Sequence, residues 1–468
     1  MKKTALSIPV VFFLALITAN AQTSTALAQP RSAKAGTTAP KTGPTAPGPD
    51  KGLPAAATHP FVAPSGPVKV EIRRTDSSWQ LIRNGQPYFV KGAGGSVYPD
   101  RIAAYGGNSI RTWSSRDSKK VLDSAAAHGL TVLVGLEVTS ERHGFKYDDS
   151  AAVKRQLDRI REEVLKYKDH PALLAWGIGN ELNLQYSNPK VWDAVNEISR
   201  MIHQVDPNHP TTTVLAGVNK GLVDNIKARV PDIDLLSVNT YGGLPGLPHA
   251  LRQAGWEGPY LVTEWGPTGH WEGPQTIWKM PIEETSSEKA AVYKSRYEKS
   301  IEVDTQRCLG SYVFLWGQKQ ERTPTWYGLF TDKGEESEVV DVMQYLWSGT
   351  WPENKAPHIY SLKINEKKAS ENVYLVPGTS YKVLAVAADP DKDKLSWRWE
   401  LLSEPTKVGN GGDFESKPLP VEGLVMPGAD GAAELKAPAQ EGAYRLFVYI
   451  TDGHNNIATA NIPFYVKK

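Results

Sequence analysis

Eight short apolar runs alternate with helical patterns between residues 68 and 351, and this alternation limits the possible folds more than any other feature. The runs are rich in Val, Leu and Ile and end at turn residues, as is typical of parallel strands buried on both faces. Eight such strand–helix units predict an α/β fold, a (β/α)8 TIM barrel. The expected strands are 89–92, 108–113, 131–137, 173–179, 211–215, 234–239, 260–263 and 311–316.

A doubly wound open sheet is the alternative α/β arrangement. That fold usually carries a glycine-rich phosphate-binding turn, Gly-x-Gly-x-x-Gly, after its first strand. The sequence Gly92-Ala93-Gly94-Gly95 follows the first expected strand but lacks the third glycine at the required spacing. The barrel is therefore the favoured interpretation.

The N-terminal region has the composition of a processing signal followed by a linker. Lys2 and Lys3 precede an apolar stretch at residues 5–19, and small residues follow, so residues 1–28 are predicted to be a signal peptide. Residues 29–67 are rich in Pro, Ala and Thr, which is typical of a linker. We expect an exported protein, periplasmic or secreted, without an integral membrane segment in the mature chain.

The C-terminal region changes from strand–helix units to strands alone. Residues 68–352 form the predicted barrel, and residues 357–468 contain short alternating strands separated by Gly, Pro and Asp turns. This pattern predicts an immunoglobulin-like β-sandwich that acts as a spacer or as a carbohydrate-binding module. Within it, Asp389, Asp391 and Asp393 place oxygen ligands at alternating positions, so this turn is either a calcium site or a solvated acidic turn.

Two expected barrel strands end in a glutamate. Glu181 follows the fourth strand and Glu264 follows the seventh. The C-terminal ends of barrel strands meet on one face, and burying an unpaired carboxylate there is costly, so both residues are candidates for catalysis. A pair of carboxylates can hydrolyse a glycosidic bond, with retention when they are about 5–5.5 Å apart and with inversion when they are farther apart.

Several motifs carry a resemblance to a known family. Residues 174–181 resemble the acid/base strand of clan A retaining glycoside hydrolases, especially the catalytic barrel of glycoside hydrolase family 2. Residues 262–266 resemble the nucleophile strand of the same barrels, and residues 237–241 resemble their sixth strand. Arg111 and Trp316 also match family positions.

The resemblance implies a role for each matching residue. Glu181 is expected to be the general acid/base and Glu264 the nucleophile. Asn180 is expected to hydrogen-bond the sugar 2-hydroxyl, a contact that strengthens in the transition state. Tyr241 and Arg111 are expected to hold Glu264 ionised and oriented.

Further residues near the strand ends are candidates for substrate binding. The resemblance places Trp316 as the floor under the reacting sugar. Trp113 and Glu137 end the second and third strands, where Glu137 is a pocket residue or a salt-bridge partner. Aromatic residues in the loops after strands seven and eight are either sugar platforms or loop packing: Trp271, Trp278, Trp326 and Tyr327.

The predicted function is retaining hydrolysis of O-glycosidic bonds in a β-linked oligosaccharide or polysaccharide, with a carbohydrate as the partner and no cofactor. The net charge of +2 gives no argument for nucleic acid, and His-x-His and His-Glu-x-x-His metal motifs are absent from the sequence. Residues 89–92 and the Asn180-Glu181 pair also resemble β-1,3-glucan transglycosylases, which is one alternative. A non-catalytic glycan-binding protein is the other, and the oligomeric state stays open.

Overall fold

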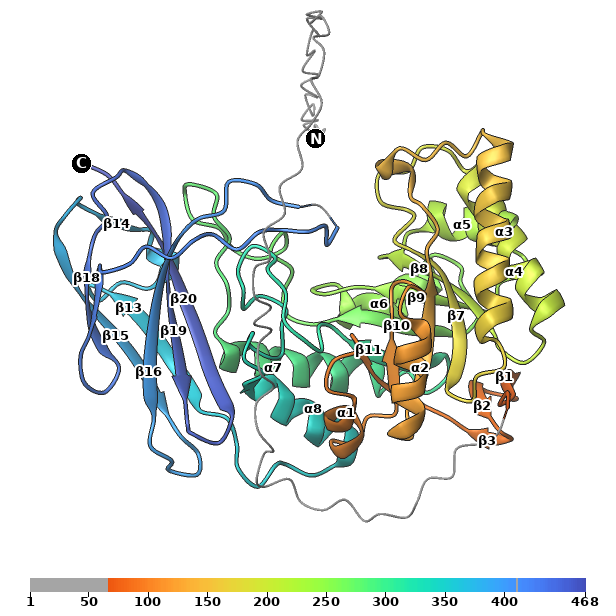
Figure 1. Cartoon of the computed structure of the whole chain (residues 1–468), viewed down its shortest axis with the longest axis horizontal. Coiled ribbons are helices and arrows are strands. Elements are labelled where there is room, and N and C mark those ends of the chain that lie inside the picture. The colour runs from red at the N-terminus through yellow and green to blue at the C-terminus, as the bar shows by residue number, and fades with distance from the viewer. Residues whose placement is uncertain (1–65, 410) are drawn as a thin grey trace, which may run out of the picture. The chain divides into compact units, whose positions relative to one another are not determined.

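The computed structural model describes residues 66–409 and 411–468. Within these residues, a closed barrel of parallel strands is followed by two mainly antiparallel β-sheets (Figure 1). The prediction of a TIM barrel followed by an all-β domain is confirmed. The predicted signal peptide and nearly all of the predicted linker lie outside the described residues, and the exact domain limits stay predictions.

The barrel closes in the strand order β10-β11-β4-β5-β6-β7-β8-β9. Every neighbouring pair is parallel. The strands are almost entirely buried because helices cover their outer side and side chains fill the interior. They are β4 (Val90–Gly94), β5 (Ser109–Arg111), β6 (Thr131–Leu136), β7 (Leu173–Asn180), β8 (Thr211–Ala216), β9 (Leu235–Asn239), β10 (Tyr260–Trp265) and β11 (Cys308–Val313).

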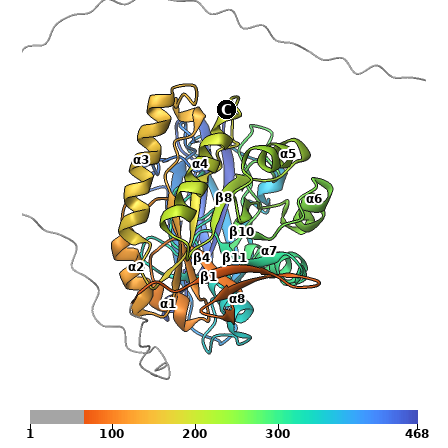
Figure 2. The same cartoon turned by 90° about the vertical axis from the view of Figure 1, so that its right-hand side faces the viewer.

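Helices surround the barrel, as Figure 2 shows. Side chains cap the starts of α3 (Ser150–Tyr167) and α7 (Ser286–Arg296). The Asp149 carboxylate accepts hydrogen bonds from the backbone N–H groups of Ala151 and Ala152, and Thr285 with Glu288 forms a capping box. The helices are α1 (Pro99–Ala104), α2 (Ser118–Ala127), α3 (Ser150–Tyr167), α4 (Lys190–Val205), α5 (Lys220–Arg229), α6 (Leu247–Gln253), α7 (Ser286–Arg296) and α8 (Glu338–Ser348). Among the described residues, none of the helices combines the length and the apolar character that crossing a membrane would require.

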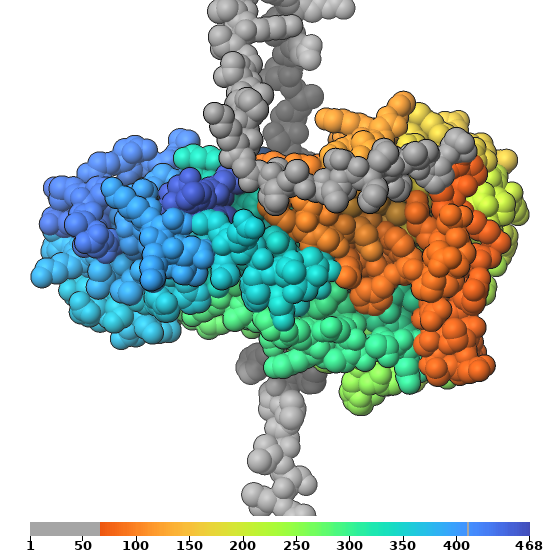
Figure 3. Space-filling view, turned by 90° about the horizontal axis from the view of Figure 1, so that it is seen from below, coloured from red at the N-terminus to blue at the C-terminus, as the bar shows by residue number. Residues whose placement is uncertain are grey.

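A three-stranded hairpin sheet closes the lower end of the barrel. It consists of β1 (Val70–Arg74), β2 (Trp79–Arg83) and β3 (Gln86–Pro87), with the predicted turn at Asn84 and Gly85. Apolar residues of the hairpin pack with residues from the early parts of the barrel strands. The sheet lies at the surface, as the orange region in Figure 3 shows. The opposite end, where the strands finish, is therefore left for a functional site.

The eighth strand differs from the prediction. It was expected at residues 311–316, but β11 ends at Val313. The backbone N–H of Leu315 donates to the carbonyl of Tyr327, and that of Trp316 donates to the carbonyl of Gly94. The apolar run continues beyond the strand because its last residues enter a packed loop, which hydrophobicity alone does not distinguish from a strand.

The C-terminal domain consists of two sheets around one apolar core. One sheet has the order β13-β15-β18-β17, and the other has the order β12-β20-β19-β16, with β14 also paired to β20. The short β12 (Glu336–Ser337) precedes α8 in the barrel part of the chain. The other strands are β13 (His358–Ile364), β14 (Val373–Leu375), β15 (Ser380–Ala388), β16 (Ser396–Ser403), β17 (Val425–Pro427), β18 (Ala432–Lys436), β19 (Gly442–Thr451) and β20 (Asn456–Val466).

A buried polar network joins the sandwich to the loop between β10 and α7. Arg445 of β19 donates to the backbone carbonyl of Pro281 over 2.8 Å, and Asn461 of β20 donates to Glu283 over 2.5 Å. Lys289 of α7 forms an ion pair with the same carboxylate. The loop that follows β10 is thus fixed from both sides.

Candidate active site

Glu264 lies in β10 near its C-terminal end and is 6% exposed. Its Oε1 accepts hydrogen bonds from Nη1 of Arg111 at 2.9 Å and from Nε1 of Trp113 at 2.6 Å. Its Oε2 accepts a hydrogen bond from the Tyr241 hydroxyl at 3.1 Å. Three donors, two from the end of β5 and one from the loop after β9, therefore hold this carboxylate in one orientation.

Arg111 ends β5 and is almost fully buried. Besides Glu264, its guanidinium donates to the Thr263 carbonyl at 2.7 Å and to Oδ1 of Asn180 at 2.6 Å. It also lies over the ring of Trp113, with 5.1 Å to the ring centroid. A guanidinium presents its donors in a rigid fork, so it fixes the positions of all these groups at once.

Glu181 directly follows β7 and adopts a left-handed backbone with φ of 52°, shortly after Gly179 at 71°. A non-glycine residue in this region is strained, and such strain concentrates at functional sites. Oε1 of Glu181 accepts a hydrogen bond from Nδ2 of Asn239 at 2.9 Å. Burial, reinforced by the charge of Glu264, raises the pKa of Glu181 to about 7.

Asn239 connects the surroundings of the two glutamates. It ends β9, donates to Glu181, and accepts a hydrogen bond from the Thr263 hydroxyl at 2.9 Å. Arg111 also approaches its Oδ1 at 3.4 Å. Asn239 was not among the predicted site residues, although its position at the end of an apolar strand, like that of Asn180, was an available signal.

Asn180 is the last residue of β7. Its Oδ1 accepts a hydrogen bond from Arg111 and lies 3.3 Å from Nδ2 of Asn239. Both contacts use the oxygen, so the amide nitrogen points the other way. This orientation suits a donor to a sugar hydroxyl.

An aromatic wall lies beside Glu264. Tyr241 packs edge-on against Phe314 with 6.1 Å between ring centroids, and Phe314 packs edge-on against Trp113 at 5.7 Å. Trp271 contacts Tyr241 at 5.6 Å and is 56% exposed. Of the proposed sugar platforms, Trp271 therefore has an accessible ring beside the site.

The other three predicted platform residues have packing roles. Trp326 and Tyr327 are buried, at 3% and 2% exposure, within the aromatic cluster around Tyr241. Trp278 packs against Tyr374 and Tyr465 of the sandwich.

Two predicted site residues lie elsewhere. Trp316 has no exposed surface and packs against Phe330 and Trp347 in the barrel's apolar core, so a sugar cannot stack on it. The expectation was wrong because the strand ends three residues earlier; Phe314 is the aromatic residue from this region that reaches the site. Glu137 is half exposed, and its contact with Arg116 at 4.0 Å is outside the network around Glu264.

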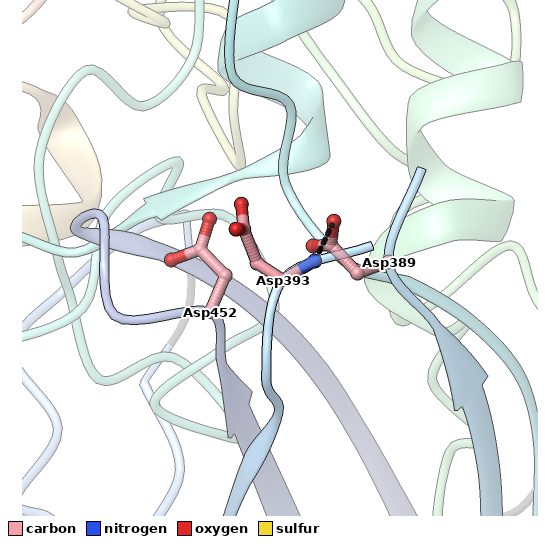
Figure 4. A group of neighbouring side chains, drawn as sticks. All are labelled: Asp389, Asp393 and Asp452. Atoms are coloured by element: carbon pink, nitrogen blue, oxygen red, sulfur yellow. Dashed lines mark hydrogen bonds between the residues drawn. The ribbon is translucent and has the colours of Figure 1, made fainter. Parts of the chain in front are cut away.

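The acidic turn of the sandwich is arranged differently from the prediction. Asp389, Asp393 and Asp452 bring ligand oxygens within 4.8 Å of one another (Figure 4), which is a grouping that could hold a metal ion. Asp391 instead accepts a hydrogen bond from the backbone N–H of Lys355 at 2.7 Å. The carboxylates of Asp389 and Asp452 also accept hydrogen bonds from backbone N–H groups of their own turns. These two residues therefore stabilise the turns in which they lie.

Part of the barrel matches a known protein family. The family model described as glycosyl hydrolases family 2, TIM barrel domain, matches residues 102–273. The barrel is similar to the catalytic barrel of family 2. The predicted resemblance is therefore confirmed, and the match contains Arg111, Glu181 and Glu264.

Two curated relatives are glycosidases. A probable mannan endo-1,4-β-mannosidase C from Aspergillus terreus is 27% identical over 165 residues, covering 29% of this chain and 40% of the relative. A putative mannan endo-1,4-β-mannosidase 4 from Arabidopsis thaliana is 32% identical over 93 residues, covering 19% of this chain and 22% of the relative. The chain thus spans less than half the length of the curated relatives it matches.

Solved structures similar to the chain include a β-D-glucuronidase from Dictyoglomus thermophilum. It is 17% identical, with a TM-score of 0.47, and the match covers 60% of this chain and 54% of that chain. A family 2 β-galacturonidase from Eisenbergiella tayi is 18% identical, with a TM-score of 0.47. The match covers 61% of this chain and 54% of that chain.

Proposed function

We propose that the protein is a retaining glycoside hydrolase in which Glu181 is the general acid/base and Glu264 is the nucleophile. The observation that carries the proposal is the contrast between the two carboxylates at the C-terminal ends of β7 and β10. Three donors, one of them the Arg111 guanidinium, orient Glu264, whereas burial and the charge of Glu264 raise the pKa of Glu181 to about 7. Two carboxyl groups with such different surroundings suit the nucleophile and acid roles of double displacement.

In the first step, Glu264 attacks the anomeric carbon and the bond to the leaving oxygen breaks. Glu181 gives its proton to that oxygen, so the leaving group departs as an alcohol and a glycosyl–enzyme ester remains. In the second step, Glu181 takes a proton from water, which attacks the anomeric carbon and releases Glu264. Asn180 donates to the sugar 2-hydroxyl, while Arg111 keeps both Asn180 and Glu264 in place.

The proposed substrate is a β-linked polysaccharide, with β-1,4-mannan as the first candidate. The similarity to two mannan endo-1,4-β-mannosidases supports this choice. The exposed ring of Trp271 beside Tyr241 supports a sugar-stacking subsite next to the reacting unit. The basic and apolar start of the chain supports export, which would bring the enzyme to an extracellular or periplasmic polysaccharide.

Azide rescue tests the mechanism. The wild type and Glu264→Ala are assayed on β-1,4-mannan and on dinitrophenyl β-mannoside, with and without added azide. We expect activity in the wild type, none in Glu264→Ala, and formation of an α-glycosyl azide when azide replaces the missing carboxylate. The inverted configuration of that product, relative to the β-linked substrate, identifies Glu264 as the nucleophile.

Two results would contradict the proposal. Turnover by Glu264→Ala without azide would remove the assigned nucleophile. A wild type that releases no reducing ends from mannan, other β-glycans or activated aryl glycosides would remove the enzymatic function itself.

A further inference from the structure

The connection between β16 and β17 of the sandwich contacts two loops on the upper face of the barrel. Residues 411–415, here called the rim segment, provide these contacts. On one side, Lys319 donates to the Gly412 carbonyl at 2.7 Å, and the backbone N–H of Arg322 donates to Glu415 at 2.7 Å. Lys319 and Arg322 lie in the loop that follows β11.

On its other side, the rim segment contacts the loop that follows β6. Nη1 and Nη2 of Arg142 donate to the two carboxylate oxygens of Asp413 at 3.1 and 3.3 Å. His143 lies 3.5 Å from the same carboxylate. Since β4 and β5 stand between β11 and β6 in the barrel, the rim segment links two loops that two strands separate.

The rim segment brings Arg142 close to the turn that follows Glu181. A Cβ placed on Gly411 would lie 3.3 Å from Nη2 of Arg142 and 3.0 Å from Cδ1 of Leu184, and the backbone N–H of Leu184 donates to the carbonyl of Glu181 at 2.9 Å. The positive charge of Arg142 is one of the influences that oppose the rise in the pKa of Glu181. The Arg142 side chain is 13% exposed, and the two-point contact with Asp413 fixes both its position and the plane of its guanidinium. A residue of the sandwich therefore helps to hold a cation in the loop after β6, the strand next to the one that Glu181 follows.

We propose that Asp413 is a positioning residue that holds Arg142 at the leaving-group side of the barrel mouth, so that the sandwich completes the substrate site. This inference rests on the proposed function. Glu181 protonates the oxygen of the departing sugar, so a guanidinium near Glu181 is placed to donate to hydroxyl groups of that sugar. The sandwich is then more than a spacer, because it helps to bind the part of the glycan that leaves.

The surroundings of Glu181 give a second consequence. The charged and hydrogen-bonding groups that face it are Glu264 from β10, Asn239 from β9, Arg111 from β5, and Arg142 from the loop after β6. Removing the Arg142 charge takes away an influence that lowers the pKa of Glu181, so this pKa rises. An enzyme that needs protonated Glu181 then keeps its activity to higher pH.

The test uses the full-length protein and a matched control. Asp413→Ala, Arg142→Met and the control Glu422→Ala are assayed on β-1,4-mannohexaose and on dinitrophenyl β-mannoside. Glu422 is an exposed carboxylate on the same β16–β17 connection. The hexaose has a sugar leaving group that requires binding and protonation, whereas the dinitrophenolate group departs without a proton.

We expect Asp413→Ala and Arg142→Met to lower kcat/KM on mannohexaose by about 10-fold or more, because small displacements of a positioning group are costly. Activity on dinitrophenyl β-mannoside stays close to that of the wild type. The basic limb of the pH profile shifts to higher pH in Arg142→Met. Equal behaviour of Asp413→Ala and Glu422→Ala on both substrates would overturn the inference.

Hydrogen exchange separates this inference from the proposed function. We expect faster amide exchange in residues 138–149 of Asp413→Ala than of the wild type, with no change in Glu422→Ala. Unchanged exchange in Asp413→Ala would overturn the positioning role even in an active enzyme. A wild type that is inactive on both substrates contradicts the proposed function, while the exchange result still decides whether Asp413 holds the Arg142 loop.

Discussion

Glu181 is partly buried at the barrel mouth, and Glu283 is buried at the junction with the sandwich. The two carboxylates differ in the number of donors around them. Burial raises the pKa of Glu283, yet the charge of Lys289 and several hydrogen bonds outweigh it and leave the pKa below its usual value. The donors are Lys289 at 2.5 Å, Thr325 at 2.8 Å, Thr323 at 2.6 Å and Asn461 at 2.5 Å.

Glu181 accepts a hydrogen bond from Asn239 and faces the negative charge of Glu264, so its pKa rises to about 7. Burial acts in the same direction on both glutamates. The donors and neighbouring charges therefore decide whether a buried carboxylate becomes a permanently charged structural group or one that exchanges a proton near neutral pH. The following predictions test this contrast.

The largest expected effect is on the chemistry at Glu181. Glu181→Gln removes the proton donor, so kcat/KM on mannan falls by about 10²–10⁴-fold, the usual contribution of general acid/base catalysis. Activity on dinitrophenyl β-mannoside falls much less in the first step because that leaving group needs no proton. Steady-state rates and the burst of dinitrophenolate measure this, with Glu162→Gln on the exposed side of α3 as the control.

At the junction, the expected effect is on stability. Glu283→Gln leaves the buried Lys289 ammonium without its counter-charge, and breaking a buried pair in this way costs about 3–5 kcal/mol of unfolding free energy. Urea denaturation measures the loss. Glu284→Gln, at the half-buried neighbouring position, is the control; equal stability of the two variants would show that the Glu283 network is not structural.

The pH dependence of the unfolding free energy tests the raised pKa of Glu181. The folded state binds a proton at Glu181 more tightly than the unfolded chain, so the wild type loses stability between pH 4.5 and about 7, where the unfolded chain has already released that proton. Glu181→Gln carries no such proton. We expect it to match the wild type below pH 4.5 and to exceed it above pH 7 by about 1–3 kcal/mol. Melting temperatures measured across this range give the difference, and a variant less stable than the wild type at pH 8 would contradict the assigned shift.

The smallest expected effect concerns Trp271, which lies on the same loop after β10 as Glu283. Trp271→Ala removes an exposed aromatic face, a contact worth about 0.5–1.5 kcal/mol, so KM for mannohexaose rises by about 2- to 10-fold with little change in kcat. Trp351→Ala is the control because that exposed ring stacks on Tyr345. An unchanged KM would remove Trp271 from the proposed sugar-stacking subsite.

The sequence predicted those parts of the fold and of the candidate site that depend on the local pattern of apolar and polar residues. The barrel strands followed from apolar runs, and Glu181 and Glu264 stood out because a carboxylate is an unusual end to such a run. Trp316 was placed wrongly because an apolar run does not reveal where the regular strand ends and a packed loop begins. Its neighbour Phe314 reaches the site instead.

The parts of the candidate site that the sequence did not predict depend on contacts between segments that are distant in the sequence. Asn239 joins the network because β9 stands beside β10 in the closed barrel. The pairing of Arg142 with Asp413 links residues 271 positions apart, which periodicity within a window cannot reveal. The contact of Glu283 with Asn461 of the sandwich, 178 positions away, was hidden for the same reason.

The short strand β12 has a consequence for how the C-terminal domain behaves in isolation. Glu336 and Ser337 pair in parallel with the start of β20, and β14 covers the end of the same strand. Without the barrel, the start of β20 would present unpaired N–H and C=O groups, which promote edge-to-edge association of β-sheets. A sandwich expressed alone would then tend to self-associate and precipitate, and the barrel segment serves as the cover that keeps this edge soluble.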